Sequence, residues 1–283
     1  MTLSRFRFYF QLASTFLTNS YLGVFFTRTI NSNILKGVCV PYLNCYACPS
    51  ALFSCPIGTL QHFMAIHTVP YYWLGIVGLV GLTTGRMACG WLCPFGFLQE
   101  LLYKIKCKKI VVPIYLTYLK YVVLVVLVML VPYLTGELAF SKLCPAGTLT
   151  AGIPWVLWNP TNPATGQQVL PDGPGVLFAV DLIILAGCLV WFVVSKRPFC
   201  RAICPMGAIL SIFNRFSLIR LEVDRKCDGC NVCQVNCPTE LTVAMDVDSG
   251  DCIRCLECTR CGHVKIAKIL PQQNKGQRSC VKM

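Results

Sequence analysis

Long apolar stretches separated by short polar segments make up most of the first 220 residues of this 283-residue chain. Four stretches are long enough to predict membrane-spanning helices, at about 8–26, 69–85, 111–134 and 176–194, the second being near the lower limit of about 17 residues. The first contains Gln11 and Asn19, so we expect that helix to face protein rather than lipid. The pattern predicts a four-helix membrane domain over residues 1–220.

The pattern changes after residue 220, where cysteines become dense and long apolar runs end. We expect a small module over residues 221–270 and a tail over 271–283. The predicted fold class is therefore an all-α membrane domain with four spans, joined to a small α+β ferredoxin-like module. Buried helices of a large soluble core are the alternative interpretation of the apolar runs.

One short phrase recurs at the edges of the apolar stretches, beginning at Cys55, Cys93, Cys144 and Cys204, and each time it reads Cys-Pro-x-Gly. The proline ends regular hydrogen bonding, and we expect the glycine to permit a sharp turn. Thiolates placed this way suit metal sites at helix ends, and the turns could dip into the membrane as re-entrant pieces.

The order of these phrases predicts an internal repeat. Each half contains a span, an outer motif, a second span and an inner motif, so the halves run in the same direction and an axis along the membrane normal would relate them. Side by side, the two parallel two-helix repeats would bring Cys93 near Cys204 and Cys55 near Cys144.

Composition supports a membrane protein: 55% of the residues are hydrophobic and only 13% are charged, against about 25% charged in soluble domains. The net charge of +13 could indicate nucleic acid, but the basic residues gather at the ends of apolar segments and in the C-terminal module. That distribution argues against nucleic-acid binding.

Lysine and arginine placement predicts the orientation. With the N-terminus inside, the inner segments contain 21 basic residues and the outer loops contain Arg28, Lys36 and Lys142. The positive-inside rule then places both termini in the cytoplasm of a multi-pass protein in the inner membrane of a prokaryote. Lys120 lies within the third stretch, and we expect it to snorkel to the inner face.

The C-terminal cysteines match the spacing of a two-cluster bacterial ferredoxin, in which the fourth cysteine of each run serves the other cluster. That rule assigns one [4Fe-4S] cluster to Cys227, Cys230, Cys233 and Cys261. It assigns a second to Cys252, Cys255, Cys258 and Cys237. A zinc ribbon has different spacing. The second run departs from the ferredoxin pattern, because two residues precede Cys261 and Gly262-His263 replaces the usual proline.

Two Cys-x3-Cys-Pro pairs stand at the inner ends of the spans, Cys89 with Cys93 and Cys200 with Cys204. The i, i+4 spacing puts two sulfurs on one helical face, so the pairs together could hold a third [4Fe-4S] cluster. A redox-active dithiol pair and an unliganded structural role are the alternatives.

The outer side offers five cysteines. We predict a fourth cluster on Cys45, Cys48, Cys55 and Cys144, with Cys39 as an alternate ligand. Disulfides are the alternative, because the outer side of a bacterial membrane is oxidising.

Several other polar or reactive side chains have a less specific interpretation. Asp181 lies within the fourth span and could serve as a proton relay or could simply be exposed near its outer end. We expect interfacial roles for His62 and His67, and packing or free thiols for Cys107, Cys188 and Cys280. Fingerprints of nucleotide and nicotinamide sites do not occur in the sequence.

The two Cys-x3-Cys-Pro motifs followed by a ferredoxin run resemble the NapH/NosR-type membrane ferredoxins, over about residues 69–265. The resemblance implies electron transfer between the quinone pool or a cytoplasmic donor and a redox protein on the outer side. It carries over to Cys89, Cys93, Cys200, Cys204 and the ferredoxin cysteines. The outer block from Cys39 to Pro49 is not part of that pattern, which favours a metal path that continues to the outer face.

The predicted function is therefore that of an electron-transfer subunit of an oxidoreductase complex. It would work beside other redox subunits, including an extracytoplasmic partner that carries flavin or haem. Two alternatives remain: a quinol dehydrogenase subunit with a quinone near the inner motif, and an accessory protein for metal-centre assembly or regulation.

Overall fold

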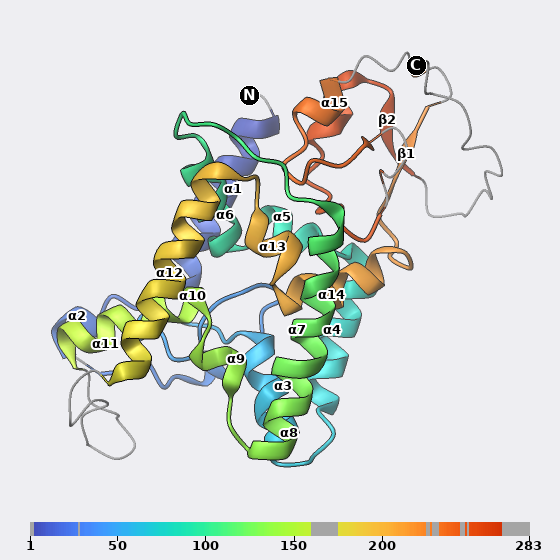
Figure 1. The fold of residues 1–283 in the computed structure, drawn as a ribbon. Coiled ribbons are helices and arrows are strands. Elements are labelled where there is room, and N and C mark those ends of the chain that lie inside the picture. The colour runs from blue at the N-terminus through green and yellow to red at the C-terminus, as the bar shows by residue number, and fades with distance from the viewer. Residues whose placement is uncertain are drawn as a thin grey trace.

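The structure is a computed structural model that describes residues 3–27, 29–159, 175–224, 227, 232–243, 247 and 249–267. In this part of the chain the fold is mostly helical, with one small two-stranded sheet (Figure 1). Cys230, Cys280 and the predicted tail lie outside the described residues.

The first 220 residues contain the following α-helices: α1 (Leu3–Thr18), α2 (Val24–Thr27), α3 (Pro56–Ala65), α4 (Tyr71–Thr84), α5 (Met87–Trp91), α6 (Pro94–Tyr103), α7 (Leu119–Val123), α8 (Val131–Thr135), α9 (Ala139–Lys142), α10 (Pro145–Gly147), α11 (Ile153–Trp158), α12 (Val176–Val194), α13 (Pro198–Ala202) and α14 (Pro205–Asn214). Helical turns of other pitch are the 3-10 segments η1 (Ile34–Gly37) and η2 (Ile114–Tyr118) and the π segments η3 (Leu124–Leu130) and η4 (Thr148–Gly152). The C-terminal module contains β1 (Arg220–Val223), α15 (Val232–Val235), the 3-10 turn η5 (Glu257–Cys261) and β2 (Val264–Ala267), with β1 antiparallel to β2.

Two of the four predicted spans form helices that are long and apolar enough to cross a membrane. One is the continuous helix Ile114–Thr135, of 22 residues and mean hydropathy 2.3, and the other is α12, of 19 residues and mean hydropathy 2.7. Both expose most of their apolar side chains, since only 28% and 17% of their most apolar windows are buried. Figure 1 shows them in green and yellow, running along the body of the molecule. Such surfaces suit lipid contact.

The other two predicted spans are shorter in the structure. Helix α4 has 14 residues, which is about 21 Å of helix against a hydrocarbon core of about 30 Å. Helix α1 has 16 residues and buries a polar face: Gln11 Nε2 donates to Gly90 O at 2.8 Å and Ser14 Oγ donates to Leu92 O at 2.9 Å. The expectation that this segment faces protein is confirmed for that polar side.

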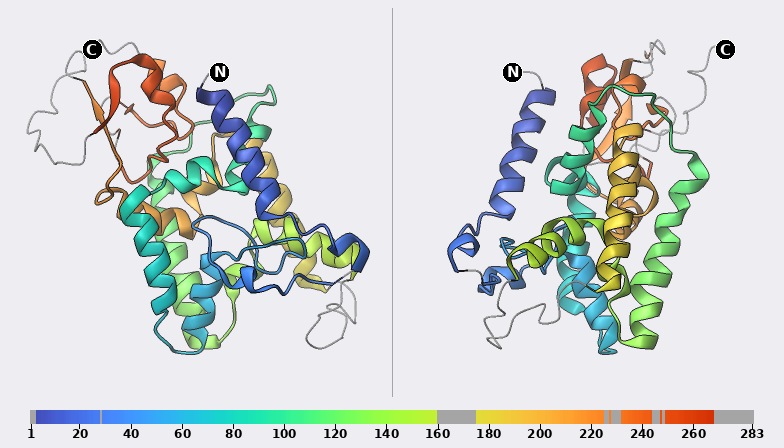
Figure 2. Two further views of the ribbon diagram at one scale, coloured as in Figure 1. Left: turned by 180° about the vertical axis from the view of Figure 1, so that it is seen from behind. Right: turned by 60° about the vertical axis from the view of Figure 1, so that its left-hand side comes forward.

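The C-terminal module is fastened to the helical body. In both views of Figure 2 it lies at the same end of the molecule as the start of α1. Asn214 of α14 donates through Nδ2 to the carbonyls of Ser249 and Cys252, at 2.8 and 2.9 Å. A Cβ added to Gly90 of α5 would lie 2.4 Å from Ile253 O, so α5 and the module approach as closely as backbone allows.

The structure gives Lys120 a protein partner. Its side chain is only 2% exposed and forms an ion pair with Asp251 of the C-terminal module. Asp251 also accepts from Arg86 Nη1, at 3.3 Å. A carboxylate on the docked module therefore replaces the water that the ammonium group would otherwise seek.

Two glycines on α4 test how tightly this helix packs. Gly81→Ala places a Cβ 2.6 Å from the Phe213 ring of α14, so overpacking should lower the free energy of unfolding by about 1–3 kcal/mol. Gly78→Ala meets nothing within 4 Å, and alanine in a helix should leave stability unchanged or raise it by up to about 1 kcal/mol. Thermal unfolding of both variants in detergent checks this, and equal midpoints would contradict the packing of α4 on α14.

Candidate metal centres

The four Cys-Pro-x-Gly phrases have one local structure. In each, the cysteine is the N-cap residue of a helix, with φ between −76° and −62° and ψ between 114° and 130°, and the proline occupies the first turn. Proline forces the residue before it out of the helical region, and its missing N–H costs nothing at a helix start. The Sγ atoms of Cys93 and Cys204 each accept a hydrogen bond from the amide of the motif's own glycine, at 3.4 Å.

The role expected for the motif glycines is wrong. They lie inside the first helical turn rather than at a left-handed position. What they provide is space: a Cβ on Gly96 would lie 3.1 Å from Arg197 Nη1, and one on Gly207 would lie 2.9 Å from Cys200 O and 3.1 Å from Arg86 Nη2. Each inner glycine therefore lets an arginine from the other half of the chain approach the helix start.

The inner cysteines of both halves come together at the centre of the molecule. We call Cys89, Cys93, Cys200 and Cys204 the inner set; each is between 5% and 6% exposed. Burial and, after it, the neighbouring Cys200 and Cys89 thiols raise the pKa of the Cys93 thiol to about 12. The pKa of Cys204 is raised in the same way, by burial and then by Cys200, Cys89 and Cys93.

The outer cysteines form a second group, which includes one residue from the second half. Cys45, Cys55 and Cys144 line one small cavity of about 30 Å³. Burial raises the pKa of the Cys144 thiol to about 12, with Cys45 and Cys55 contributing. We call these three residues the outer set.

Two further outer cysteines flank this set. Cys48 lies close enough to Cys45 to affect its charge, but its Sγ is 3.3 Å from Ser50 Oγ and it lines a different cavity. Cys39 lies close enough to Cys55 to raise the pKa of that thiol, and the Cys39 Sγ is 3.2 Å from Thr59 Oγ1. Both remain candidates for a fourth ligand. All cysteines among the described residues are free, so no disulfide joins any of these.

The described C-terminal cysteines lie in two groups. Cys237, Cys252, Cys255 and Cys258, the second module set, line one cavity of about 20 Å³. Burial and the three partner thiols raise the pKa of Cys258. Burial raises the pKa of the Cys233 thiol, and the nearby Cys261 and Cys227 thiols raise it as well. These three cysteines are the described members of the first module set.

These arrangements fit clusters better than single ions. Among the described residues no three His, Cys, Asp or Glu side chains converge on one point at which a metal ion could bind. In a [4Fe-4S] cluster each thiolate binds a different iron, so the four sulfurs stand apart around a cube. The second module set, with four thiols around one small cavity, matches that requirement.

A short stretch of backbone connects the inner and outer sets. The backbone amide of Leu43 lies close enough to the Cys93 sulfur to influence the pKa of that thiol, and the amide of the next residue, Asn44, lies similarly close to the Cys55 sulfur. Consecutive amides bring these two sulfurs to within on the order of 10 Å of each other. Figure 2 shows the loop that contains them, in blue, crossing the middle of the molecule. The two sets are therefore neighbours, although the motifs were predicted on opposite faces.

Two glutamines that the sequence analysis missed also support the sets. Gln99 and Gln61 each follow a motif cysteine by six residues. Gln99 Nε2 donates to Cys200 Sγ at 3.1 Å. Gln61 Nε2 donates to Leu127 O at 3.1 Å, in π segment η3, where the altered turn frees a carbonyl, and Gln61 Oε1 accepts from Ser141. The repeated spacing was the signal that could have identified them.

The less specific candidates lie outside the thiol groups. His62, His67 and Cys107 are exposed, and Cys188 is buried in the core on α12. Asp181 lines a surface cavity of about 450 Å³ together with Cys45 and Trp155.

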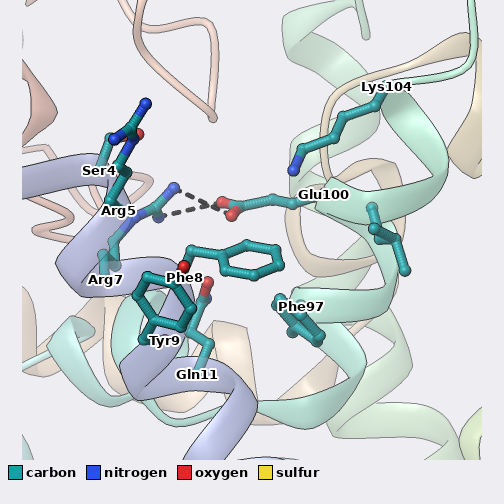
Figure 3. Close-up of a pocket in the computed structure, with 10 residues that line it drawn as sticks. Ser4, Arg5, Arg7, Phe8, Tyr9, Gln11, Phe97, Glu100 and Lys104 are labelled. Carbon is teal, nitrogen blue, oxygen red and sulfur yellow. Dashed lines mark hydrogen bonds and ion pairs between the residues drawn. The ribbon is translucent and has the colours of Figure 1, made fainter.

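A polar pocket of about 330 Å³ lies between α1 and α6 (Figure 3). Arg7 closes one side of it by a double hydrogen bond to Glu100, at 3.0 and 2.9 Å. Glu100 also accepts from Arg197 Nε at 2.9 Å, and Arg197 in turn donates to Cys89 O at 2.8 Å. Glu100 thus connects the pocket to Arg197, which lies beside the inner set.

Comparison with known proteins assigns iron–sulfur chemistry to both halves. A family model described as a 4Fe-4S binding domain matches residues 66–113 and 178–223. The first match contains Cys89 and Cys93, and the second contains Cys200 and Cys204. The internal repeat predicted from the motifs is therefore visible to the family model as two matches. No solved structure matches the chain.

Named relatives come from archaea and bacteria. The chain is 32% identical over 219 residues to uncharacterized protein MJ0750 of Methanocaldococcus jannaschii, covering 72% of this chain and 81% of that protein. It is 27% identical over 166 residues to the methylamine utilization ferredoxin-type protein MauN of Paracoccus denitrificans, covering 58% of this chain and 52% of MauN. It is 29% identical over 179 residues to the regulatory protein NosR of Stutzerimonas stutzeri, covering 62% of this chain and 23% of NosR. The chain thus spans about half of MauN and a quarter of NosR.

Asp251 offers a test of how the module docks beside the inner set. Asp251→Asn leaves Arg86 and Lys120 without their shared carboxylate, and breaking such a buried pair should cost about 3–5 kcal/mol. The exposed pair of Lys142 with Glu137 is the matched control, because Glu137→Gln should cost less than about 1 kcal/mol. Limited proteolysis and thermal unfolding measure both. Equal stability of the two variants would contradict the docking.

Proposed function

The chain belongs to the family of ferredoxin-type 4Fe-4S proteins that includes MJ0750 and MauN, and from this premise we propose that it is a membrane-embedded electron-transfer subunit. It would relay electrons between its C-terminal module on the cytoplasmic side and a redox partner on the outer side.

Four groups of thiols would hold [4Fe-4S] clusters in this proposal. When bound, the clusters supply one-electron oxidation and reduction. The first module cluster would use Cys227, Cys230, Cys233 and Cys261, and the second Cys237, Cys252, Cys255 and Cys258. The inner cluster would use Cys89, Cys93, Cys200 and Cys204, and the outer cluster Cys45, Cys55, Cys144 and either Cys48 or Cys39.

The observation that carries the proposal is the unbroken adjacency of these groups. Cys255 of the second module set belongs to the same buried core cluster as Cys89, Cys93 and Cys204. The consecutive amides of Leu43 and Asn44 then join the inner set to the outer set. Electrons crossing the molecule would pass from group to group through packed protein, without the full thickness of a bilayer between any two groups.

Membrane placement follows from the two long apolar helices. We propose that Ile114–Thr135 and α12 span the bilayer, that α4 and α1 complete four spans, and that the loop over residues 31–55 enters from the outer side to reach Cys93. Both termini would then lie in the cytoplasm of a prokaryotic cell. The domains would be 1–220 for the membrane part, 221–270 for the module and 271–283 for the tail.

The outer exit of the relay would be Cys45. Among the outer set it is the residue that also lines the surface cavity of about 450 Å³. Its half-buried side chain is the most accessible of the three, whereas Cys55 and Cys144 are each 7% exposed. An extracytoplasmic flavin- or haem-bearing protein docked there would lie next to the outer set.

The polar pocket between α1 and α6 favours a second candidate, a quinol dehydrogenase subunit. Its volume of about 330 Å³ falls within the range of ligand sites, and Glu100 could accept a proton there. Reduction of the purified protein by a short-chain quinol would support this candidate. Loss of that reduction in Glu100→Gln, with retained reduction by dithionite, would place the quinol in this pocket.

Iron content tests the relay directly. The wild-type chain should bind about sixteen irons, four for each of four clusters, and Cys93→Ser should lose about four of them together with one EPR signal. Cys107→Ser is the matched control, since that thiol is exposed and belongs to none of the groups. A wild-type content of only about eight irons would remove the membrane relay and leave an anchored ferredoxin.

The same variant separates the relay from an accessory role in metal-centre assembly. In cells, Cys93→Ser should leave the partner enzyme mature but starved of electrons. An immature partner enzyme, with the chain's own redox centres intact, would favour the accessory role.

A further inference from the structure

The internal repeat extends upstream of the inner motifs to a pair of arginines. Arg86 precedes Cys89 by three residues, and Arg197 precedes Cys200 by three residues. Each half therefore reads Arg-x2-Cys-x3-Cys-Pro-x-Gly. The side chains of Arg86 and Arg197 are both 0% exposed, which is rare for arginine unless it is paired.

Each arginine contacts the opposite half of the chain. Arg86 Nη2 donates to Cys200 O of the second half, at 3.0 Å. Arg197 Nη1 donates to Cys89 O of the first half, at 2.8 Å. The motif glycines leave room for these two contacts, because Gly207 lies against Arg86 and Gly96 lies against Arg197. The contact is thus reciprocal, as the predicted axis between the repeats requires.

Each guanidinium has one carboxylate partner that comes from outside the motifs. Arg86 pairs with Asp251 at 3.3 Å, and Arg197 pairs with Glu100 at 2.8 Å. Both carboxylates are shared with a second buried cation. Asp251 also pairs with Lys120. Glu100 also pairs with Arg7.

Two buried cations on one carboxylate, as at Asp251, favour a further anion in the same low-dielectric interior. Neutral thiols do not provide one. A [4Fe-4S] cluster with four thiolates does, because four negative sulfurs outweigh the 2+ or 1+ charge of the iron–sulfide core. The residues therefore fit a cluster at the inner set in charge as well as in shape.

Both arginines lie beside the inner thiols. Arg86 lies close enough to interact with the charges of Cys89, Cys200 and Cys204, and Arg197 with those of Cys200 and Cys93. Their hydrogen bonds to the carbonyls of Cys200 and Cys89 place each guanidinium against the backbone of an inner cysteine. Both arginines therefore face the inner set.

We propose that Arg86 and Arg197 are positioning residues that set the reduction potential of the inner cluster. The inference rests on the proposed relay. A positive charge stabilises the reduced, more negative form of a cluster, so each arginine raises the potential of the inner cluster.

Redox titration of the cluster-loaded protein, followed by EPR, tests the proposal. Arg86→Gln and Arg197→Gln should each lower the potential of the inner cluster. We expect at least a tenfold change in the ratio of oxidised to reduced cluster at fixed potential, which is about 59 mV for one electron. Arg86→Lys and Arg197→Lys keep the charge and should recover most of each shift, and exposed Arg215→Gln should leave the potential unchanged.

Iron content measured on the same samples separates the possible failures. A wild-type protein with about eight irons would refute the relay and this proposal together. Full iron content with unchanged potentials in both glutamine variants would refute only the proposal. If the glutamine variants lose iron, the lysine variants decide: full iron with wild-type potentials supports the role of charge, and loss of iron with lysine as well shows that the arginines only hold the two halves together.

Discussion

The structure depends on holding four thiols from two repeats in one buried space. Thiolates and an iron–sulfur core carry net negative charge, which a low-dielectric interior disfavours unless cations are buried with it. The reciprocal arginines Arg86 and Arg197 meet this demand, and by bonding to the opposite half they also hold the two repeats together. The carboxylates that balance them, Asp251 and Glu100, then draw in the C-terminal module and α6.

Helix starts give the thiols their direction. A cysteine before proline takes an extended conformation, so its sulfur lies at the helix N-terminus, where amides and the helix dipole favour negative charge. The chain uses this device at Cys55, Cys93, Cys144 and Cys204. Because the same device recurs in both halves, two similar pieces of chain generate an inner and an outer thiol group at their interface.

The apolar exterior and the polar interior have different roles. Helix Ile114–Thr135 and α12 expose apolar side chains, while α1 turns Arg7, Gln11 and Ser14 inward to bond the backbone around the inner motif. Irregular backbone such as residues 39–55 is tolerable within an apolar environment only when protein covers it and satisfies its amides. Here buried asparagines satisfy part of that backbone, because Asn44 Nδ2 donates to Phe53 O and Asn31 Nδ2 donates to Ala51 O, each at 2.9 Å.

Cysteine spacing and hydropathy period alone determined the helical class, the internal repeat and the family, because these depend on local order along the chain. Tertiary structure alone decided that the inner and outer groups are neighbours, that Lys120 pairs with Asp251, and that the motif glycines admit arginines from the other half. These depend on contacts between residues about 50 to 130 positions apart, such as Leu43 with Cys93 and Arg86 with Cys200. A single stretch of sequence does not predict which distant side chain will pack beside a glycine. That partner is determined only when the two halves pack against each other.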